Sequence, residues 1–296
     1  MTYPLIFGEI LYDQFTDSQV LGGAPFNVAW HLQGLGLRPK IVSRIGKDVL
    51  GDQILQEIHA WQLDDSYIQR DEKHATGTVK ITLDHGQPTF NITEDVAYDH
   101  ISPENILSSI LKNPPSLVYH GSLAIRQPTS RNTLLELREK LGCPVFVDIN
   151  MRAPWWDSTM IDEILPGTNW LKLNEQELQI ITDHKTNEES ELSVSAQKLL
   201  KKYQLDAIIV TLGERGAFIV DASDYYHSEP VQVTNLVDAV GAGDGFSAVS
   251  IAGLLQGWEY PLILNRATAF AAQICQQRGA INTDKEFYAS QMVRWT

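Results

Sequence analysis

Short apolar segments followed by helix-like segments recur along this chain, and this alternation limits the folds open to it. The first apolar segments are Leu5–Ile10 and Lys40–Gly46, and the helix-like segments after them begin near Ala24 and Val49. The pattern continues with apolar runs at 117–121, 144–148, 170–173 and 207–213 and helical patterns at 131–141 and 190–202. Strands that alternate with helices indicate a parallel sheet covered by helices. The sequence therefore predicts an α/β fold.

The last third of the chain departs from this alternation. Residues 215–220 and 224–233 have the pattern of antiparallel strands. Two helices, at 243–256 and about 260–277, are expected to close the chain because their apolar residues recur at helical spacing.

A hairpin interrupts the strand and helix units at residues 77–92. Val79, Ile81 and Leu83 alternate with polar residues, 84–87 has the composition of a turn, and 88–92 reads as the return strand. A two-stranded hairpin is not stable alone, so we expect it to pair with the stretch from Ile10 to Leu21 and form a flap over a cleft. The sequence predicts a single α/β domain over 1–296, with lid segments at about 10–22 and 76–95.

The charge and cysteine content narrow the class of protein. The formal net charge is −14 and no basic patch is visible, which argues against a nucleic-acid-binding surface. Cys143 and Cys275 form neither a CxxC motif nor a disulfide framework, which fits a reducing compartment. The N-terminus has no secretory pattern, and no apolar run is long enough for a membrane span. We therefore expect a soluble, cytoplasmic protein.

A turn of small residues precedes the helix expected at 243–256. Gly241, Ala242 and Gly243 leave the backbone uncovered, so several N–H groups can point at one anion at the helix N-terminus. Asp244 follows in the first turn and would repel a bound anion. Its presence makes sense if it takes a proton from a nucleophile that attacks that anion. The alternative is that Asp244 is only the N-cap of the helix.

Two other segments bring polar groups to places where ligands bind. Gly22 and Gly23 allow the backbone to approach a ligand closely, and Asn27 lies at the start of the next helix. The side chain of Asn27 is expected either to face a polyol or to cap that helix. Polar residues, among them Arg152, follow the predicted strand at 144–148, and the carboxyl ends of parallel strands face the ligand crevice in such sheets.

Several common signatures are missing from the sequence. The chain has no phosphate-binding P-loop motif, no Gly-x-Gly-x-x-Gly after the first strand and no Gly-x-Ser-x-Gly. The eight histidines are scattered without metal-ligand spacing. His31 and His59 fall in predicted helices and are expected to be core or surface residues, not catalytic ones.

Four motifs, in their order along the chain, resemble those of the ribokinase-like (pfkB-type) carbohydrate kinases over essentially the whole length. The motifs are Gly22–Ala29, Asn174–Glu177, Thr211–Gly213 and Asp238–Asp244. The form Gly-Gly-Ala-Pro-x-Asn-Val-Ala is especially similar to bacterial fructokinases. The resemblance implies a three-layer α/β/α fold with a central, mostly parallel sheet and a small β-sheet lid.

The resemblance also implies roles for individual residues. Asp244 would deprotonate a sugar hydroxyl, and the amides of Gly241, Ala242, Gly243 and Asp244 would hold the transferring phosphoryl group. The sugar-binding residues that it implies are Asp13, Gly22, Gly23, Asn27 and Arg152. The alternatives are a solvated loop position for Asp13 and a salt bridge to a neighbouring carboxylate for Arg152.

Nucleotide and metal contacts follow from the same resemblance. The residues implied to bind the nucleotide are Lys172, Asn174, Thr211, Gly213, Gly241 and Gly243. Asn174 and Glu177 would organise the Mg²⁺ on ATP through water, or alternatively form a helix start with Asn174 as cap. Asp238 and Gly279 fall where the family often binds a monovalent cation. Ala239 stands where many members carry Thr, which leaves activation by potassium open.

The implied function is the ATP-dependent phosphorylation of a sugar hydroxyl, with fructose as the first candidate. Ribose, 2-keto-3-deoxygluconate or a nucleoside are alternative substrates, because specificity depends on lid contacts that the sequence does not fix. Arg126 is a further candidate for specificity, without an assigned partner. A sugar-binding regulator without catalysis is the alternative from another class. The hairpin edges predict a homodimer through the lid, unless the lid covers only its own site.

Overall fold

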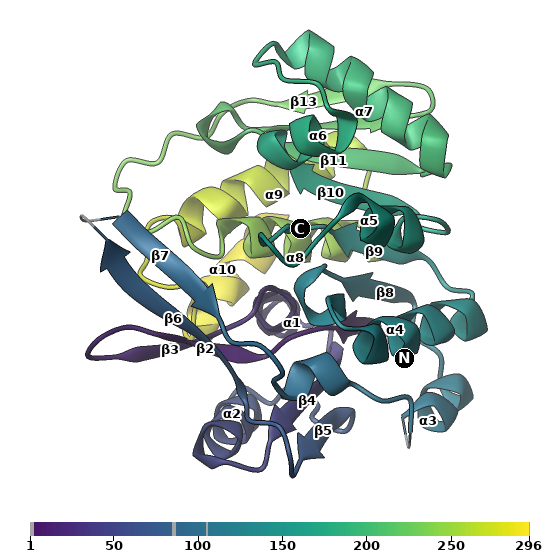
Figure 1. The fold of residues 1–296 in the computed structure, drawn as a ribbon. Helices are drawn as coiled ribbons and strands as arrows, with labels where there is room; N and C mark the ends of the chain where they lie inside the picture. Colours follow the sequence, from purple (N-terminus) through teal and green to yellow (C-terminus); the bar gives the residue numbers. More distant parts are fainter. Residues whose placement is uncertain (1–2, 85–86, 105, 296) are drawn as a thin grey trace.

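A nine-stranded sheet runs through the described part of the chain, residues 3–84, 87–104 and 106–295 of this computed structural model (Figure 1). Its strand order is β13-β12-β11-β10-β9-β8-β1-β4-β5. The strands are β1 (Pro4–Phe7), β4 (Lys40–Gly46), β5 (Ile68–Asp71), β8 (Leu117–His120), β9 (Val145–Asp148), β10 (Trp170–Asn174), β11 (Ala207–Thr211), β12 (Ala217–Asp221) and β13 (Tyr225–Ser228). The pairs from β5 to β11 are parallel, and β12 and β13 add antiparallel strands at one edge.

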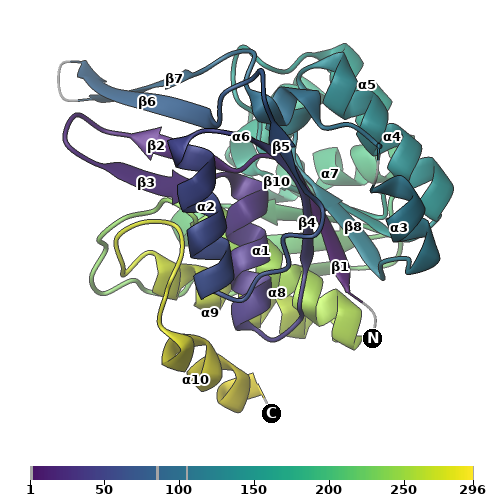
Figure 2. The ribbon, with the colours of Figure 1, turned by 90° about the horizontal axis from the view of Figure 1, so that it is seen from below.

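Helices cover both faces of this sheet, as Figure 2 shows. Two separate apolar cores are buried in this arrangement. One layer holds α3 (Leu107–Lys112), α4 (Pro128–Leu141), α5 (Ser158–Ile164), α6 (Glu175–Thr182) and α7 (Glu189–Tyr203). The other holds α1 (Ala24–Gly34), α2 (Val49–Ala60), α8 (Ala242–Gln256), α9 (Tyr260–Ile274) and α10 (Lys285–Trp295). The central strands are buried on both sides, which explains their continuous apolar runs. The three-layer α/β/α architecture expected from the sequence is confirmed.

A second, four-stranded sheet projects from one end of the large one, at the left of Figures 1 and 2. Its order is β3-β2-β6-β7, with β2 (Leu11–Gln14), β3 (Gln19–Gly22), β6 (Gly77–Asp84) and β7 (Gln87–Ile92). The expected pairing of the hairpin with the earlier segment is confirmed, because β2 runs parallel to β6 from Leu11 opposite Gly77. The centre of the predicted turn, His85 and Gly86, lies outside the described residues, as does the side chain of Leu83.

Some expected boundaries were wrong, for identifiable reasons. The strand expected at 224–233 ends at Ser228, because Pro230 has no N–H to donate to a neighbouring strand. The first strand ends at Phe7 instead of Ile10, and the helix expected from Arg131 begins at Pro128, a residue suited to a first turn. The helix expected to run to 277 ends at Ile274.

The closing part of the chain contains a third helix, α10, that the sequence analysis did not predict. It packs on the core through Tyr288, which accepts or donates a hydrogen bond with buried His31 at 2.9 Å. The expected non-catalytic placement of two histidines is consistent with this, since His31 is in the core and His59 pairs with Asp65 at the surface. No helix among the described residues combines the length and apolarity needed to cross a membrane.

Candidate active site

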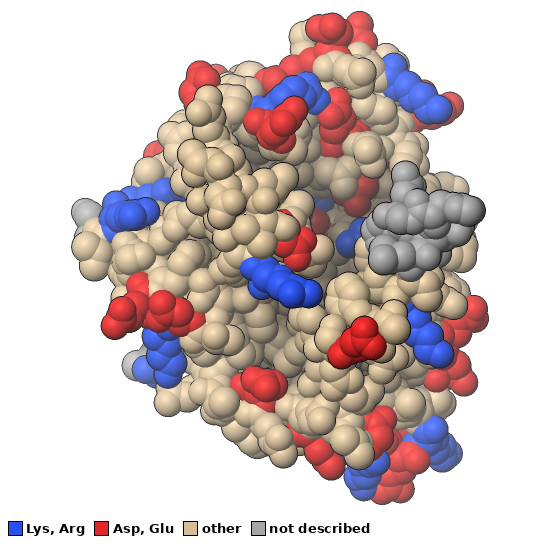
Figure 3. Space-filling view, turned by 90° about the vertical axis from the view of Figure 1, so that its left-hand side faces the viewer, with Lys and Arg blue, Asp and Glu red and all other residues tan. Residues whose placement is uncertain are grey.

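Two cavities meet at the N-terminus of α8. One, of about 730 Å³, lies between α8, α9 and the 229–239 loop, and the other, of about 780 Å³, lies between the lid and the carboxyl ends of the central strands. Thr211, Ala239 and Gly243 line both cavities. In Figure 3 the face toward which the lid projects is hollowed near its centre, with acidic and basic side chains at the edge of the hollow. A molecule that spans both cavities must pass the first turn of α8.

Gly241 shapes this helix start. It is the N-cap of α8 at φ 79°, and no side chain caps the helix there. A Cβ on Gly241 would lie 2.4 Å from the Cα of Ala280, in a turn that His31 holds by bonding the Ala280 carbonyl at 3.0 Å. The following amides of Gly243 and Asp244 lie in the first turn, where an α-helix offers no internal acceptors. The segment therefore forms the helix N-terminus without a side-chain cap that the sequence predicts, and anion binding there stays a prediction.

Asp244 faces the polar cavity and is not the N-cap of its helix. Its side chain is buried, and its Oδ2 accepts a hydrogen bond of 2.7 Å from Nδ2 of Asn27. Burial raises the pKa of Asp244 to about 6, although the bond from Asn27 acts in the opposite direction. At neutral pH the group is mainly a carboxylate with enhanced basicity, which suits a general base. The capping role considered for Asn27 is wrong, because Gly23 is the N-cap of α1.

A second carboxylate, Asp148 at the end of β9, has a different set of partners. Its Oδ2 accepts hydrogen bonds from Nζ of Lys172 at 2.8 Å and from Oγ of Ser247 at 2.7 Å. Burial disfavours the charged form of Lys172, but the carboxylate of Asp148, together with Asp244 and Glu177, outweighs this and raises the pKa of Lys172. The ammonium lies 3.2 Å from the position of a Cβ on Gly243. A positive charge is thus held beside the first turn of α8.

Asn174 and Glu177 form the start of α6 and also line the polar cavity. Asn174 Oδ1 accepts from the Glu177 amide at 2.9 Å, and Glu177 Oε2 accepts from the Asn174 amide at 2.8 Å. Glu177 Oε1 accepts from the Met151 amide at 2.7 Å. The capping alternative from the sequence is therefore real, yet Glu177 is buried and remains on the wall of the cavity.

The polar cavity holds carboxyl groups beneath the lid. Asp13 on β2 lines it, and burial raises the pKa of Asp13 to about 6 against the opposing charge of Arg152. Gly22 lies beside Asp13, since a Cβ there would be 3.2 Å from Asp13 Oδ2. Gly23 and exposed Arg152 also line the cavity. The five residues predicted to bind sugar therefore gather around one cavity.

Glu9 is a member of this cavity that the sequence analysis missed. It follows β1 at the carboxyl end of the strand, and its side chain is 4% exposed. Burial raises the pKa of Glu9 to about 7, and its Oε2 has no hydrogen-bond partner among the described residues. The signal was available, because polar residues at the ends of parallel strands face the ligand crevice. A Cβ on Gly23 would lie 2.6 Å from the Glu9 carbonyl oxygen, so glycine keeps these segments together.

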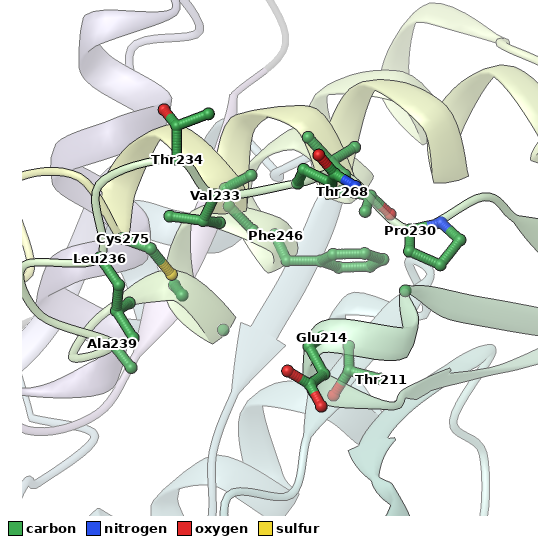
Figure 4. Close-up of a pocket in the computed structure, with 18 residues that line it drawn as sticks. Thr211, Glu214, Pro230, Val233, Thr234, Leu236, Ala239, Phe246, Thr268 and Cys275 are labelled. Atoms are coloured by element: carbon green, nitrogen blue, oxygen red, sulfur yellow. The ribbon is translucent and has the colours of Figure 1, made fainter.

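The other cavity is mostly apolar. Figure 4 shows the ring of Phe246 in its middle, with Pro230 and Thr268 toward one end and Leu236, Ala239 and Cys275 toward the other. Thr211 and Gly213, predicted to contact a nucleotide, line it from the end of β11 and the turn that follows. Such a slot suits a flat heteroaromatic group.

Asp238 and Gly279, which were predicted to hold a monovalent cation, line neither cavity. Asp238 Oδ2 accepts a hydrogen bond of 3.2 Å from the Gly279 amide, so the two residues proposed for a monovalent cation are adjacent.

Arg126 donates from Nε and Nη2 to the buried carboxylate of Asp99, each at 2.7 Å. Arg126 therefore has a partner within the fold, and the structure does not bring it to the sugar cavity as a specificity residue.

Comparison with known proteins connects this geometry to a family. The model of the pfkB family carbohydrate kinases matches residues 2–286. The chain belongs to this family. Among its relatives, an uncharacterized sugar kinase of Pyrococcus horikoshii is 29% identical over 270 residues, covering 90% of this chain and 84% of the relative. A fructokinase of Salmonella typhimurium is 27% identical, with 94% and 92% covered. A 2-dehydro-3-deoxygluconokinase of Haemophilus influenzae is 26% identical, with 89% and 88% covered.

The fold is shared with solved structures as well. A structure from Escherichia coli, described as a ribokinase II in complex with ATP and Mg²⁺, superposes with a TM-score of 0.85 at 22% identity. The superposition covers 99% of this chain and all of that one. Membership of the pfkB family makes this protein a sugar kinase, and the relatives with different substrates leave the sugar to be argued from the cavity itself.

Proposed function

We propose that this kinase transfers the γ-phosphoryl group of ATP to a primary hydroxyl of a neutral sugar, with D-fructose as the first candidate. The observation that carries the proposal is the position of Asp244. Its carboxylate lies in the first turn of α8, where an apolar cavity and a carboxyl-rich cavity meet. A base, an anion-binding turn and room for two substrates are the components that phosphoryl transfer requires.

In the proposed mechanism, Asp244 removes the proton from the sugar hydroxyl. Asn27 occupies Oδ2 of Asp244, and no described residue bonds its Oδ1, which is left to accept that proton. The hydroxyl oxygen then forms a bond to the γ-phosphorus as the bond from that phosphorus to the bridging oxygen of ADP breaks. The amides from Gly241 to Asp244 and the ammonium of Lys172 stabilise the charge on the equatorial phosphoryl oxygens. Lys172 remains charged because Asp148 holds it.

The nucleotide would place its base in the apolar cavity and its phosphates toward Gly243. Thr211 and Gly213 would contact it, with Asn174 nearer the phosphates. Mg²⁺ takes oxygen ligands and usually keeps several waters. Asn174 and Glu177 offer amide and carboxylate oxygens on the cavity wall, but backbone amides already engage them, which fits contact through water. Bound Mg²⁺ would neutralise phosphate charge.

The chemistry of the polar cavity favours a neutral sugar over a sugar acid. Glu9, Asp13 and Asp244 line it, and burial raises the pKa of each. A substrate carboxylate would add to this negative charge, and of the two cations that line the cavity, Lys172 is already paired with Asp148 and Arg152 is exposed. The cavity also contains two buried oxygen atoms, Glu9 Oε2 and Asn27 Oδ1, that accept no hydrogen bond from the described residues. Sugar hydroxyls can satisfy both.

An ADP-release assay against a panel of sugars tests the proposal. The panel contains D-fructose, D-ribose, a nucleoside and 2-keto-3-deoxygluconate, each with ATP and Mg²⁺. We expect the largest kcat/KM for D-fructose. A preference for the sugar acid would overturn the argument from charge, and sugar binding without ADP release would favour the regulator.

The lid completes the proposal. We propose that the chain is one kinase domain, with segments of about 10–22 and 76–95 closing over the sugar. Val79, Phe90 and Ile92 of the lid line the sugar cavity. Phe15 and Val20 are exposed on the lid, which supports a homodimer through this sheet, and light scattering would test it.

A monovalent cation at Asp238 and Gly279 is proposed on their contact alone, and comparing rates in K⁺ and Na⁺ tests it.

A further inference from the structure

Two histidines and an aspartate converge at the base of the lid, away from the cavities described above. His74 lies in the loop between β5 and β6, Asp95 follows β7, and His100 ends the short helix Ala97–His100. One donor atom from each residue lies within 4.8 Å of the others. Nε2 of His100 is 2.8 Å from Oδ1 of Asp95, and Nε2 of His74 is 3.8 Å from the same oxygen.

The two imidazoles bring their Nε2 atoms to the same oxygen of Asp95. The rings stack with centroids 3.7 Å apart and planes 14° from parallel, so one ring must turn out of the stack before both Nε2 lone pairs point at one ion. A single dication bound by two neutral imidazoles and the carboxylate would satisfy all three groups.

A buried carboxylate orients the first of these histidines. Nδ1 of His74 lies 3.1 Å from Oδ2 of Asp71, which is 2% exposed. Asp71 is itself fixed, because its Oδ1 accepts from the amides of Lys73 and His74 at 2.7 and 2.9 Å. A carboxylate that accepts from Nδ1–H leaves Nε2 with its lone pair free. This is the arrangement that metal-binding histidines commonly show.

From this geometry we propose that His74, Asp95 and His100 bind a divalent transition-metal ion of the Zn²⁺ type. Two imidazole nitrogens and a carboxylate oxygen form a ligand set that Zn²⁺ and Co²⁺ accept, with water in the fourth position. Mg²⁺ prefers an all-oxygen set, so the site differs from that of the metal used with ATP. The side chains of His74 and His100 are 24% and 29% exposed, which lets an ion enter. Bonds of about 2 Å require the side chains to close on the ion and one imidazole to rotate out of the stack.

The position of the site gives the ion a consequence. Residue 74 precedes β6 and residues 95 and 100 follow β7, so a bound ion cross-links both ends of the lid hairpin. The same hairpin carries Val79 and Ile92 over the sugar cavity. The ion is therefore expected to stiffen the base of the lid.

Titration of the full chain, without a histidine tag, tests the site. Co²⁺ is added and its visible absorption followed, and Zn²⁺ binding is measured by equilibrium dialysis in millimolar Mg²⁺. We expect one site in the unmodified protein, at least about tenfold weaker binding in His74→Gln and in His100→Gln, and no displacement by Mg²⁺. The matched control is His59→Gln, which removes a surface histidine that pairs with Asp65.

Three outcomes would overturn the proposal: no binding, binding that both variants retain, or displacement by Mg²⁺. Circular dichroism checks that the variants are folded, and Asp95→Asn gives a third ligand change at a 77% exposed side chain. Hydrogen exchange tests the consequence for the lid. In the unmodified protein, the amides of β6 and β7 should exchange more slowly when Zn²⁺ is present than when it is absent, and His100→Gln should show no such difference. Equal exchange rates with and without Zn²⁺ in the unmodified protein would contradict the expected stiffening.

Discussion

The two cavities that meet at α8 are built from opposite kinds of residue. The one between α8 and α9 is lined by Phe246, Val233, Leu236 and other apolar groups, with Glu214 as its acidic member. The one beneath the lid contains five acidic residues, Glu9, Asp13, Asp148, Glu177 and Asp244. An apolar slot binds by removing surface from water, whereas a polar cavity binds through directed hydrogen bonds. The difference indicates which substrate each end receives.

The junction between the cavities has the properties of neither. Thr211, Ala239 and Gly243 line both sides, and the uncapped first turn of α8 lies there. Charge develops at this point during phosphoryl transfer. A change at the junction should therefore affect the reaction itself, and a change in one cavity should affect one substrate.

The largest expected effect comes from removing the base at the junction. Asp244→Asn keeps the shape of the side chain but cannot accept the proton, so kcat should fall about 10²–10⁴-fold, with smaller changes in KM for either substrate. ADP release and sugar binding by calorimetry measure the two parts. Asp65→Asn, a surface change outside both cavities, is the control. Turnover close to that of the unmodified enzyme would contradict the role of Asp244.

A charge introduced into the apolar cavity should affect the nucleotide alone. Val233→Asp would place a carboxylate against the bound base, so KM for ATP should rise about tenfold or more, with KM for the sugar nearly unchanged. Val237→Asp is the matched control, since Val237 is 51% exposed and does not line that cavity. Equal changes in both KM values would mean that the cavities are not separate binding sites.

A smaller effect is expected at the N-cap of α8. Gly241→Ala forces a side chain into φ 79° and toward the backbone of Ala280, so it should lower both stability and kcat. Gly257→Ala has a similar φ of 71° but open space around the Cβ. Gly257→Ala serves as the control, and it should lower the free energy of unfolding by about 1–2 kcal/mol and leave kcat unchanged. Thermal unfolding and ADP release compare the two, and matching results would show that contact with Ala280 is unimportant.

The smallest effect is a shift in the pH dependence of the reaction. Because the pKa of Asp244 is raised to about 6, the base form is lost as pH falls through 6, and kcat/KM should fall with it. Asn27→Ala removes a hydrogen bond that lowers this pKa, so the midpoint should move to higher pH by about 1–2 units. Glu9→Gln removes the neighbouring carboxyl group, which has a pKa of about 7, and should still show the fall in kcat/KM at low pH. An unmoved midpoint in Asn27→Ala would separate Asn27 from the titrating group.

The fold was largely predictable because its signals are local. Buried parallel strands give continuous apolar runs, and turns at Gly142 and Gly257 end helices in the left-handed conformation. The missed helix α10 buries Tyr288 in the core, with Phe287 and Trp295 partly buried against it. The segment after Ser228 has the sequence pattern of a strand but does not continue β13. Pro230 has no N–H to donate to a neighbouring strand, and it lines the apolar cavity. The packing of α10 depends on contacts between distant segments, which a local pattern does not contain.

The candidate site was predictable where residues belong to short motifs and less so where the fold brings single residues together. The structure brings Asp244, Asn27 and Asp13 to one cavity, and their roles stay predictions. Glu9 was missed because one acidic residue after a strand is a weak signal, and the partner of Arg126 could not be deduced because Asp99 is 27 positions away. The histidine pair at the lid was missed for the same reason, since His74 and His100 have no motif spacing.

A crystal structure with a non-hydrolysable ATP analogue and the preferred sugar would decide whether the junction is where transfer occurs. The account predicts the base in the slot around Phe246, the terminal phosphate at the amides of Gly243 and Asp244, and a sugar hydroxyl within hydrogen-bonding distance of the Asp244 carboxylate. A terminal phosphate bound elsewhere, or a sugar whose hydroxyls all lie beyond the reach of Asp244, would contradict it.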